Sequence, residues 1–558
     1  MPIIFSCLKC LDDEVEKRRF PVGGKKVYYG VRFKTRQHKE IEGMAFISIF
    51  NDVLGPIMRG PSSSHTAGSH HIGRIVRSLW GQGLPSCAEF TFDPDGSYSR
   101  VYRQQSVDAG LAAGLINLAM TDEKFHRSVD VALEEGIAVR FRIEALKEAS
   151  HPNTVKIHLH SPDQDMTALA ASIGGGNIVF SQVDGWPLEI DGKTHELIII
   201  CLQRSENRIR GLLPTRGGSV HRVTHPGQPE KVLLHYRCAE ELGSSITDPI
   251  GSDPDVVTLR RVSPLFYPQK NAVQLDRSTD LIQAAAGDLN SLGEIGLAFE
   301  GIQLKRPESM IRAEMEHRFD VMQASVRQGL EERELKLKLL KPTAQKVLEA
   351  ENTGALAVGG IHLRAAARAM AVMHTANSGG VICAAPTGGS AGVLPGVLVS
   401  LIEDRKLPYS KVVQGLFAAG AAGMIIARRA TFAAEVAGCQ VEIGAAGAMA
   451  AAAVTDIAGG TFSQALDAAA ISLQNSMGSV CDLVQGRCEI PCHTRNAAAA
   501  ANAFVCADLI LGGYVNPIPF DETVDASMAV GRMLPSELRC TARGGLAVTP
   551  SALRLDED

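Results

Sequence analysis

Five cysteines lie in one alanine-rich region of the C-terminal half, and sulfur ligands concentrated in this way could hold a metal. They are Cys439, Cys481, Cys488, Cys492 and Cys506. Thiolates suit a soft metal centre such as an iron–sulfur cluster better than a hard cation. The spacing matches neither the short ferredoxin run nor a zinc ribbon with paired Cys-x-x-Cys motifs. Ordinary thiols packed in an alanine-rich core, or a bound zinc ion, therefore stay open as alternatives.

A run of hydroxyl side chains at residues 60–75, GPSSSHTAGSHHIGRI, directly precedes a helical pattern. It contributes the hydroxyl groups of Ser62, Ser63, Ser64 and Thr66. These hydroxyls and the free N–H groups of the helix start would hold a carboxylate. His65 is then beside the anion, as a base or as a substrate ligand. The simpler alternative is a helix cap rich in serine and threonine that carries a surface histidine.

A second polar turn is expected at residues 381–398, VICAAPTGGSAGVLPGVL. Pro386 and the glycines 388, 389 and 392 break one helix and start another. Backbone N–H groups would be left free around Thr387 and Ser390, which favours a second anion-binding site. A plain helix–helix turn is the alternative, and such Gly/Pro clusters mark turns more often than ligand sites.

Changes in composition divide the chain into four segments that would position these motifs. Residues 1–43 are basic, lack a clear helical or strand period, and are expected to be a disordered extension or one read from an upstream start codon. In residues 44–192, helical stretches alternate with strand-like runs, which predicts an α+β domain. The helices are expected at 69–82, 107–120 and 125–135, and the strands at 88–92, 137–144 and 153–160.

The remaining two segments differ from the first two and from each other. Residues 193–265 follow the order β-α-β-β-α-β of a ferredoxin-like module, which could bind a regulatory ligand. Residues 275–558 are almost wholly helical in pattern, and their alanine content would allow helices to approach closely. The sequence therefore predicts a multidomain α+β protein with an all-helical C-terminal domain.

Length and composition exclude several classes of protein. The 558 residues exceed what one core supports, so about three domains are expected. With 45% apolar and 21% charged residues, the chain is neither disordered nor collagen-like. The net charge of −5 gives no reason to expect nucleic acid or an anionic membrane as a partner. The longest apolar runs, 415–427 and 443–455, are shorter than a spanning helix of roughly 17–25 residues, and the N-terminus does not resemble a signal peptide. We expect a cytoplasmic protein.

Seven motifs that occur in order along the chain together resemble a known family. They are GPSSSHTAG, HPNTV (151–155), ASIGGG (171–176), APTGGSAGVLPGVL, GCQVEIG, CDLVQGRCEIPC and GGLAVTP (544–550). This combination is similar to the iron–sulfur-dependent L-serine dehydratases, or L-serine ammonia-lyases. The likeness extends from about residue 44 to the end. It is to the form whose β and α parts are often separate chains, here fused with the β part first.

The resemblance implies a cofactor and its ligands. Cys439, Cys481 and Cys492 match the three cysteines that hold a [4Fe–4S] cluster in the family. The flanking Ile-Pro identifies Cys492, rather than Cys488, as the third ligand. The fourth iron would lack a protein thiolate and would act on substrate as a Lewis acid, with no need for pyridoxal phosphate. Some relatives close that position with a cysteine near the C-terminus, but Cys540 is the only late candidate here and is expected to take no part.

The resemblance also implies the reaction, the conversion of L-serine to pyruvate and ammonia in amino-acid catabolism and gluconeogenesis. His65 would be the base or a substrate ligand, with the hydroxyls of the 62–66 run around the substrate carboxylate. The helical domain would add Thr387, Gly388, Gly389 and Ser390 across a domain interface. The segment 193–265 matches an ACT-like regulatory module that could bind an amino-acid effector, and a homodimer is expected by analogy.

Two positions depart from the family pattern. Many relatives carry Gly-His-Gly-Thr-Asp where this chain reads RQQSVD at 103–108, so a family histidine is replaced by Gln105. Some relatives have asparagine where Gly388 stands. These departures leave open another β-substituted amino acid as substrate, such as threonine or cysteine. They also leave open a sensor that carries an iron–sulfur cluster and an ACT-like module without turnover.

Overall fold

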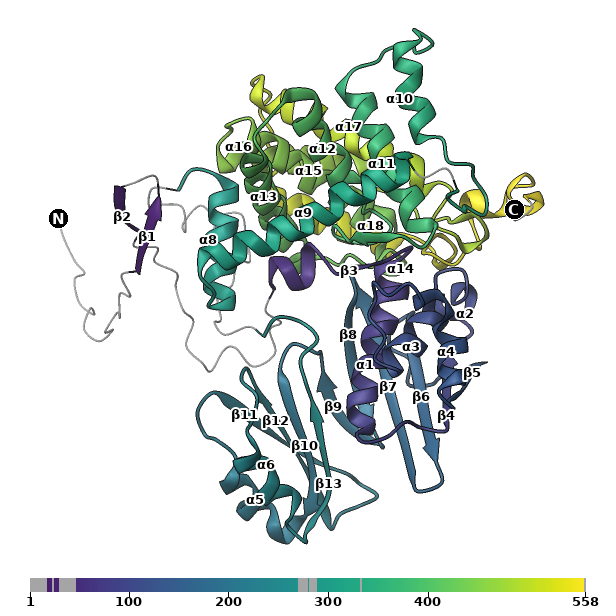
Figure 1. Ribbon diagram of the computed structural model, residues 1–558, viewed down its shortest axis with the longest axis vertical. Helices are drawn as coiled ribbons and strands as arrows, with labels where there is room; N and C mark the ends of the chain where they lie inside the picture. Colours follow the sequence, from purple (N-terminus) through teal and green to yellow (C-terminus); the bar gives the residue numbers. More distant parts are fainter. Residues whose placement is uncertain are drawn as a thin grey trace, which may run out of the picture.

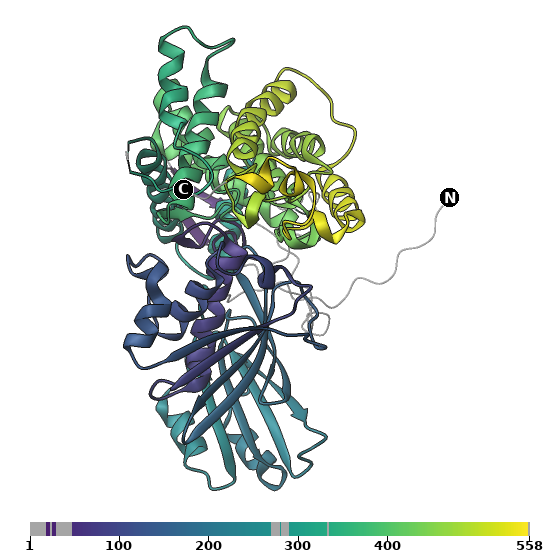
Figure 2. The ribbon, with the colours of Figure 1, turned by 90° about the vertical axis from the view of Figure 1, so that its right-hand side faces the viewer.

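The computed structural model describes residues 47–268, 289–331 and 334–555, with residue 280 and the backbone of two N-terminal strands. One lobe is mainly helical, and the other contains two β-sheets with the helices that pack on them, as both views show (Figures 1 and 2). The expected mixed α/β multidomain class with a helical C-terminal region is confirmed. The two N-terminal strands, β1 (Arg18–Val22) and β2 (Lys25–Tyr29), form an antiparallel hairpin that the sequence pattern did not predict. The rest of the predicted extension 1–43 lies outside the described residues.

The larger sheet has six strands in the order β5-β4-β6-β7-β8-β9. Its strands are β4 (Cys87–Phe92), β5 (Ala138–Ile143), β6 (Thr154–Ser161), β7 (Gln164–Gly174), β8 (Asn177–Val183) and β9 (Trp186–Ile190). Strands β4 and β5 are parallel, and every other neighbouring pair is antiparallel. One face of this sheet is covered by helices, as Figure 2 shows. They are α1 (Gly68–Trp80), α3 (Val107–Leu115) and α4 (Ser128–Glu134).

Hydrophobic periodicity explains this packing. Along β6 the inward residues Val155, Ile157 and Leu159 recur at every second position, as a strand with one buried face requires. They share one core with Ile72 and Leu79, which lie on the buried face of α1. The predicted helices and strands of this region are therefore confirmed in kind, with shifts of a few residues at their ends.

The smaller sheet contains four antiparallel strands in the order β11-β12-β10-β13. Its elements are β10 (His195–Leu202), α5 (Glu206–Leu212), β11 (Gly218–Thr224), β12 (Lys231–Cys238), α6 (Ser244–Gly251) and β13 (Val256–Val262). The order along the chain is the predicted β-α-β-β-α-β. The second helix begins at Ser244, directly after Gly243, whose backbone is extended. The ACT-like identity stays a prediction.

The helical lobe is built from eleven helices within the part of the chain that the structure describes. They are α8 (Leu292–Leu304), α9 (Glu308–Glu331), α10 (Ala344–Asn352), α11 (Ile361–Asn377), α12 (Val393–Arg405), α13 (Tyr409–Arg429), α14 (Ala434–Ala437), α15 (Ile443–Ile457), α16 (Phe462–Ser476), α17 (Cys492–Leu511) and α18 (Phe520–Met533). Small residues let them approach closely. A Cβ atom on Gly329 of α9 would lie 1.8 Å from the carbonyl oxygen of Ala371 in α11. Helix α13 is long and apolar enough to cross a membrane by length and composition, but most of it is buried inside the protein, as expected of a core helix.

The chain passes through the helical lobe before it enters the larger sheet. The π-helical turn η2 (Ile49–Val53) packs against α13, and its hydrophobic side chains belong to the core of the helical lobe. Strand β3 (Ile57–Arg59) then pairs antiparallel with β14 (Val381–Cys383). The buried carboxylate of Glu300 accepts hydrogen bonds from the Ser48 hydroxyl and from two backbone N–H groups of η2. The polar residues 60–67 are thereby placed at the boundary between the lobes.

Candidate active site

Two polar turns that are far apart in sequence meet at this boundary. The serine turn, residues 61–67, contains the short helical turn η3 (Ser63–Ala67), and the threonine turn comprises residues 386–390. A Cβ atom on Gly388 would lie 2.9 Å from both the Pro61 carbonyl oxygen and the Ser63 nitrogen. Only glycine lets the two backbones come this close.

The hydroxyl groups and the histidine of the serine turn are all buried. The set is Ser62, Ser63, Ser64, His65 and Thr66. Because His65 is 0% exposed, the alternative of a surface histidine is wrong. Thr387 and Ser390 of the threonine turn are buried as well. The structure therefore brings together the predicted polar residues of the two motifs.

The His65 ring is held between hydroxyl groups on both sides. Its Nδ1 atom lies 3.2 Å from Ser62 Oγ and 3.0 Å from Ser64 Oγ, and its Nε2 atom lies 3.0 Å from Ser97 Oγ. Ser97 donates its single hydroxyl proton to the carbonyl oxygen of Cys540, at 3.0 Å, so it accepts from Nε2–H. This assigns the ring proton to Nε2 and leaves the Nδ1 lone pair toward the serine turn.

Burial determines the charge of His65. Desolvation, and secondarily the positive charge of a protonated His151, lowers the pKa of His65 to about 3. The pKa of His151 is itself lowered to about 4 by burial. Both rings are therefore neutral around pH 7. His65 can accept a proton or a hydrogen bond, but it supplies no positive charge to the site.

The threonine turn makes hydrogen bonds within itself and to Glu442. The Thr387 N–H donates to Ser390 Oγ (3.3 Å) and the Ser390 N–H donates to Thr387 Oγ1 (3.2 Å), so neither N–H group is free. The turn satisfies these two N–H groups with its own side chains, so an anion site here would depend on the N–H groups between them, at Gly388 and Gly389. The Thr387 hydroxyl donates instead to the carboxylate of Glu442, at 2.5 Å. Burial raises the pKa of Glu442, while this hydrogen bond and the charge of Arg495 act in the opposite direction.

Five cysteines form one buried group beside the two turns. The cysteine group consists of Cys439, Cys481, Cys488, Cys492 and Cys540. Within it, the sulfur of Cys481 contacts those of Cys439 and Cys540, and these contacts together with burial hold the pKa of Cys481 well above its usual range. A similar contact with Cys488, together with burial, raises the pKa of Cys492. Cys506 lies apart, in the core of the helical lobe.

The donor set of the cysteine group fits a soft metal centre. Thiols this close repel one another when ionised, so they need a cation among them to become thiolates. Cys439 and Cys481 also place their sulfur atoms within 4.8 Å of a carboxylate oxygen of Glu442. Arg495 adds a positive charge, with Nη1 at 3.6 Å from Cys439 Sγ. The residues present therefore suit an iron–sulfur cluster, whose ligands are thiolates.

Cys540, which we expected to take no part, lies within the cysteine group. Its N–H donates to the Cys481 carbonyl oxygen at 3.0 Å, and the chain before it forms a bridge between Arg539 and Cys481. Gln105, which we expect to stand where relatives have a histidine, places its Nε2 atom 3.7 Å from Cys540 Sγ. The departure from the family pattern therefore touches the cysteine group itself.

Three polar residues of the site were not singled out from the sequence: Asn153, Glu435 and Glu442. Asn153 donates from Nδ2 to Glu435 Oε1 at 2.5 Å, and Ser64 also hydrogen-bonds to the Glu435 carboxylate. Burial, and secondarily the charge of Glu442, raises the pKa of Glu435 to about 7. Acidic residues in the apolar run AEVAGCQVEIG are a signal that could have found both glutamates, because carboxylates rarely lie within apolar segments unless they are paired.

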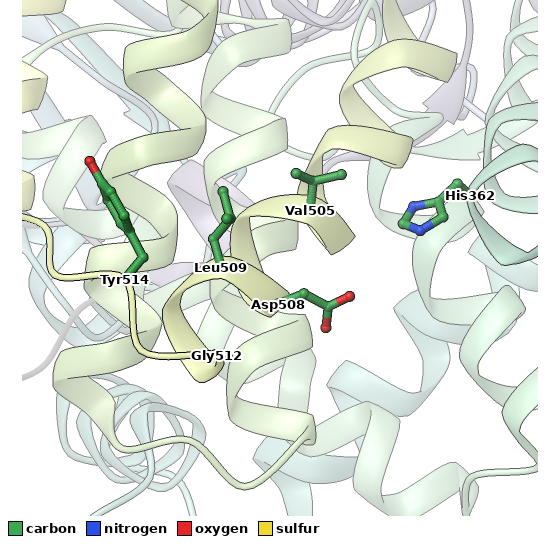
Figure 3. A pocket seen from close by; sticks show the side chains of 6 residues that line it. All are labelled: His362, Val505, Asp508, Leu509, Gly512 and Tyr514. Carbon is green, nitrogen blue, oxygen red and sulfur yellow. The ribbon is translucent and has the colours of Figure 1, made fainter.

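A shallow hollow on the outer side of α17 is separate from this site. Figure 3 shows the side chains that line it, and none of them belongs to the two turns or the cysteine group. They are His362, Val505, Asp508, Leu509, Gly512 and Tyr514. The candidate chemistry is therefore concentrated at the boundary of the lobes.

A buried thiol group beside a polar turn, with the two supplied by different lobes, is the arrangement of a candidate site between domains. A family model described as serine dehydratase alpha chain matches residues 199–547, and the chain belongs to this family. A probable L-serine dehydratase alpha chain of Bacillus subtilis is 38% identical over 266 residues, which cover 48% of this chain and 89% of the relative. The L-serine dehydratase alpha chain of Peptoniphilus asaccharolyticus is 38% identical over 252 residues, which cover 45% of this chain and 86% of the relative.

The N-terminal part has relatives of its own. A probable L-serine dehydratase beta chain of Bacillus subtilis is 29% identical over 225 residues, which cover 39% of this chain and the whole relative. The expected fusion of β-like and α-like parts in one polypeptide is thereby confirmed, and with it the assignment to the serine ammonia-lyase class of enzymes.

Proposed function

We propose that this protein is a [4Fe–4S]-dependent L-serine ammonia-lyase that converts L-serine to pyruvate and ammonia. The observation that carries the proposal is the direct contact of the serine turn with the threonine turn beside the cysteine group. Substrate-binding hydroxyls and soft metal ligands are thereby combined in one buried site. The relatives named as L-serine dehydratases support the substrate.

Cys439, Cys481 and Cys492 would hold the cluster. When bound, the cluster supplies a Lewis-acidic iron that polarises the carbon–oxygen bond of the substrate hydroxyl. Cys540 and Cys488 lie in the same buried group.

The serine turn would bind the substrate carboxylate. The hydroxyl of Ser63 is buried and has no hydrogen-bond partner in the described part of the chain, so it has a donor to offer a ligand. Hydroxyl donors that the fold already holds in place lose little further conformational entropy when they bind an anion. His65, neutral and with its Nδ1 lone pair toward the turn, would orient Ser62 and is our candidate for the group that removes the α-proton.

Turnover is tested by pyruvate release from L-serine with anoxically purified protein reconstituted with iron and sulfide. L-Threonine, L-cysteine and D-serine are measured in parallel. Serine turnover that disappears in air supports the proposal, and an intact cluster with no turnover of serine contradicts it. His65→Ala should abolish turnover and leave the absorption of the cluster unchanged; surviving activity would refute the role of His65.

A sensor that binds an iron–sulfur cluster without turnover is the second candidate. The observation that favours it is Gln105, which hydrogen-bonds to the Gly486 carbonyl oxygen at 3.1 Å and lies beside Cys540 where the family has a histidine. The serine assay separates the two candidates. An amino-acid effector at residues 193–265 and a homodimer are further proposals, which sedimentation with and without L-serine would test.

A further inference from the structure

The buried carboxylate of Glu435 has a role that neither the proposed cluster nor the serine turn accounts for. We infer that Glu435, together with Asn153, binds the α-ammonium group of the substrate and makes the site selective for α-amino acids over α-hydroxy acids. This inference rests on the proposed function, because it assigns a binding partner within the same site.

The charge balance around Glu435 calls for a cation. The residue is 3% exposed, and no lysine, arginine or histidine of the described chain forms an ion pair with it within 4.0 Å. The neighbouring histidines His65 and His151 are neutral, and the nearby Glu442 adds negative charge. A buried carboxylate without a cation costs free energy, so a ligand that brings a positive charge would be bound favourably. Of the polar groups of serine, only the ammonium is positive.

Asn153 offers a second acceptor to the same group. Since a carboxylate can only accept, the contact with Glu435 fixes Nδ2 of the Asn153 amide toward Oε1. The Oδ1 atom of Asn153 is then left buried and without a partner among the described residues. An ammonium group has three N–H donors, so it could satisfy Oδ1 and the Glu435 carboxylate together.

The position of Glu435 agrees with the shape of an α-amino acid. The ammonium and the carboxylate of such a substrate are attached to one carbon, so their two receptors must be adjacent. Ser64, in the middle of the serine turn, hydrogen-bonds directly to Glu435. The receptor proposed for the ammonium therefore borders the receptor proposed for the carboxylate.

The fold holds Glu435 in this place from the side of the larger sheet. A Cβ atom on Gly174, at the end of β7, would lie 2.9 Å from the nitrogen of Ala433, just before α14. With φ of +105° at Gly174, a side chain there would also be strained. The close approach presses the start of α14 against the sheet lobe, so Glu435 of the helical lobe reaches Asn153 of the other.

A matched pair of unreactive ligands tests the inference. L-Alanine and L-lactate share a carboxylate and a methyl group and have no leaving group at the β-carbon. They differ only at the α-carbon, where L-alanine carries an ammonium group and L-lactate a hydroxyl group. Their affinities for the anoxic, cluster-loaded protein are measured by titration calorimetry. The variants are Glu435→Gln, which removes the charge and keeps the shape, and Asn153→Ala. Asp456→Asn is the control, because Asp456 is also a buried carboxylate without an ion-pair partner in the described chain but caps α8 outside the site.

We expect wild type to bind L-alanine about ten- to a hundred-fold more tightly than L-lactate, as a buried charged hydrogen bond of roughly 1.5–3 kcal/mol implies. Glu435→Gln should remove this preference by weakening L-alanine alone, Asn153→Ala should reduce it, and Asp456→Asn should retain it. Iron content and cluster absorption identify any variant that has not folded or loaded.

Two outcomes separate failure of the inference from failure of the proposed function. If Glu435→Gln loses serine turnover yet keeps the wild-type preference for L-alanine, the inference is overturned and Glu435 serves proton transfer instead. If wild type prefers L-alanine but does not turn over L-serine, the ammonium site stands and the proposed reaction falls.

Discussion

Replacing Glu435 by glutamine should stabilise the cluster-free protein at alkaline pH and leave its stability unchanged at acid pH. Burial and the charge of Glu442 raise the pKa of Glu435 from an ordinary value of 4.5 to about 7 in the folded state. Between these two values the folded protein keeps a proton that the unfolded chain has released. The free energy of unfolding of wild type therefore falls as the pH rises from about 4.5 to about 7, and stays reduced above it.

The size of the effect follows from the same shift. One pKa unit corresponds to about 1.36 kcal/mol, so ionised Glu435 costs the folded state about 3 kcal/mol at pH 8. Glutamine has no charge to bury, and its amide can keep the Asn153 hydrogen bond through its oxygen. The gain in melting temperature at pH 8 should be on the order of 5 °C if the helical lobe unfolds as one unit.

Thermal denaturation of wild type and Glu435→Gln from pH 4 to pH 9 measures this difference. The surface substitution Glu123→Gln controls for the loss of one negative charge, since Glu123 is exposed. If Glu435→Gln raises the melting temperature equally at pH 4 and pH 8, or lowers it at pH 8, the reasoning is refuted. A carboxylate that destabilises its own fold is expected where function requires it.

Three further predictions concern the site directly. Replacing any one of the three proposed cluster ligands by alanine should prevent cluster assembly, whereas Cys488→Ala should permit it, as measured by iron and sulfide analysis. A Cys488→Ala protein without a cluster would contradict the assignment. The three proposed ligands are Cys439, Cys481 and Cys492. Gly388→Ala should force the two turns apart and lower the free energy of unfolding by about 1–3 kcal/mol. The value of kcat/KM for serine should fall about ten-fold or more, with the iron content unchanged. If the variant has wild-type kinetics, the contact between the turns is not needed for catalysis. Because the pKa of His65 is about 3, the pH–rate profile of wild type should show no limb from this ring between pH 5 and 8. Titration of the His65 imidazole within that range, followed by NMR of labelled histidine in the inactive, folded protein, would contradict this.

Much of the local structure could be predicted from the sequence, because it depends on periodicity within short windows. The alternation along 153–160 and the helical spacing along 69–82 correspond to β6 and α1 in the structure. The two polar turns and the cysteines could also be identified from residue types alone. Each lies in a local pattern that requires no knowledge of its neighbours in space.

The contacts that assemble the site could not be predicted in this way. Gly388 touches Pro61, and Glu435 touches Asn153, across hundreds of residues of sequence. Cys540 was expected to stand apart, yet its backbone pairs with Cys481 and brings the thiol into the cysteine group. Such pairs have no signature in composition or spacing, since they arise where separate elements pack together.

The sequence by itself determined the kinds of element, the motifs that carry chemistry and the resemblance to a family of lyases. Only the tertiary structure decided that residues 47–59 belong to the core of the helical lobe, which places the serine turn against the threonine turn. It also decided which buried carboxylates have no ion-pair partner among the described residues, as is the case for Glu435. The physical reason is that secondary structure follows from local side-chain periodicity, whereas the charge and burial of a site depend on what the rest of the chain packs around it.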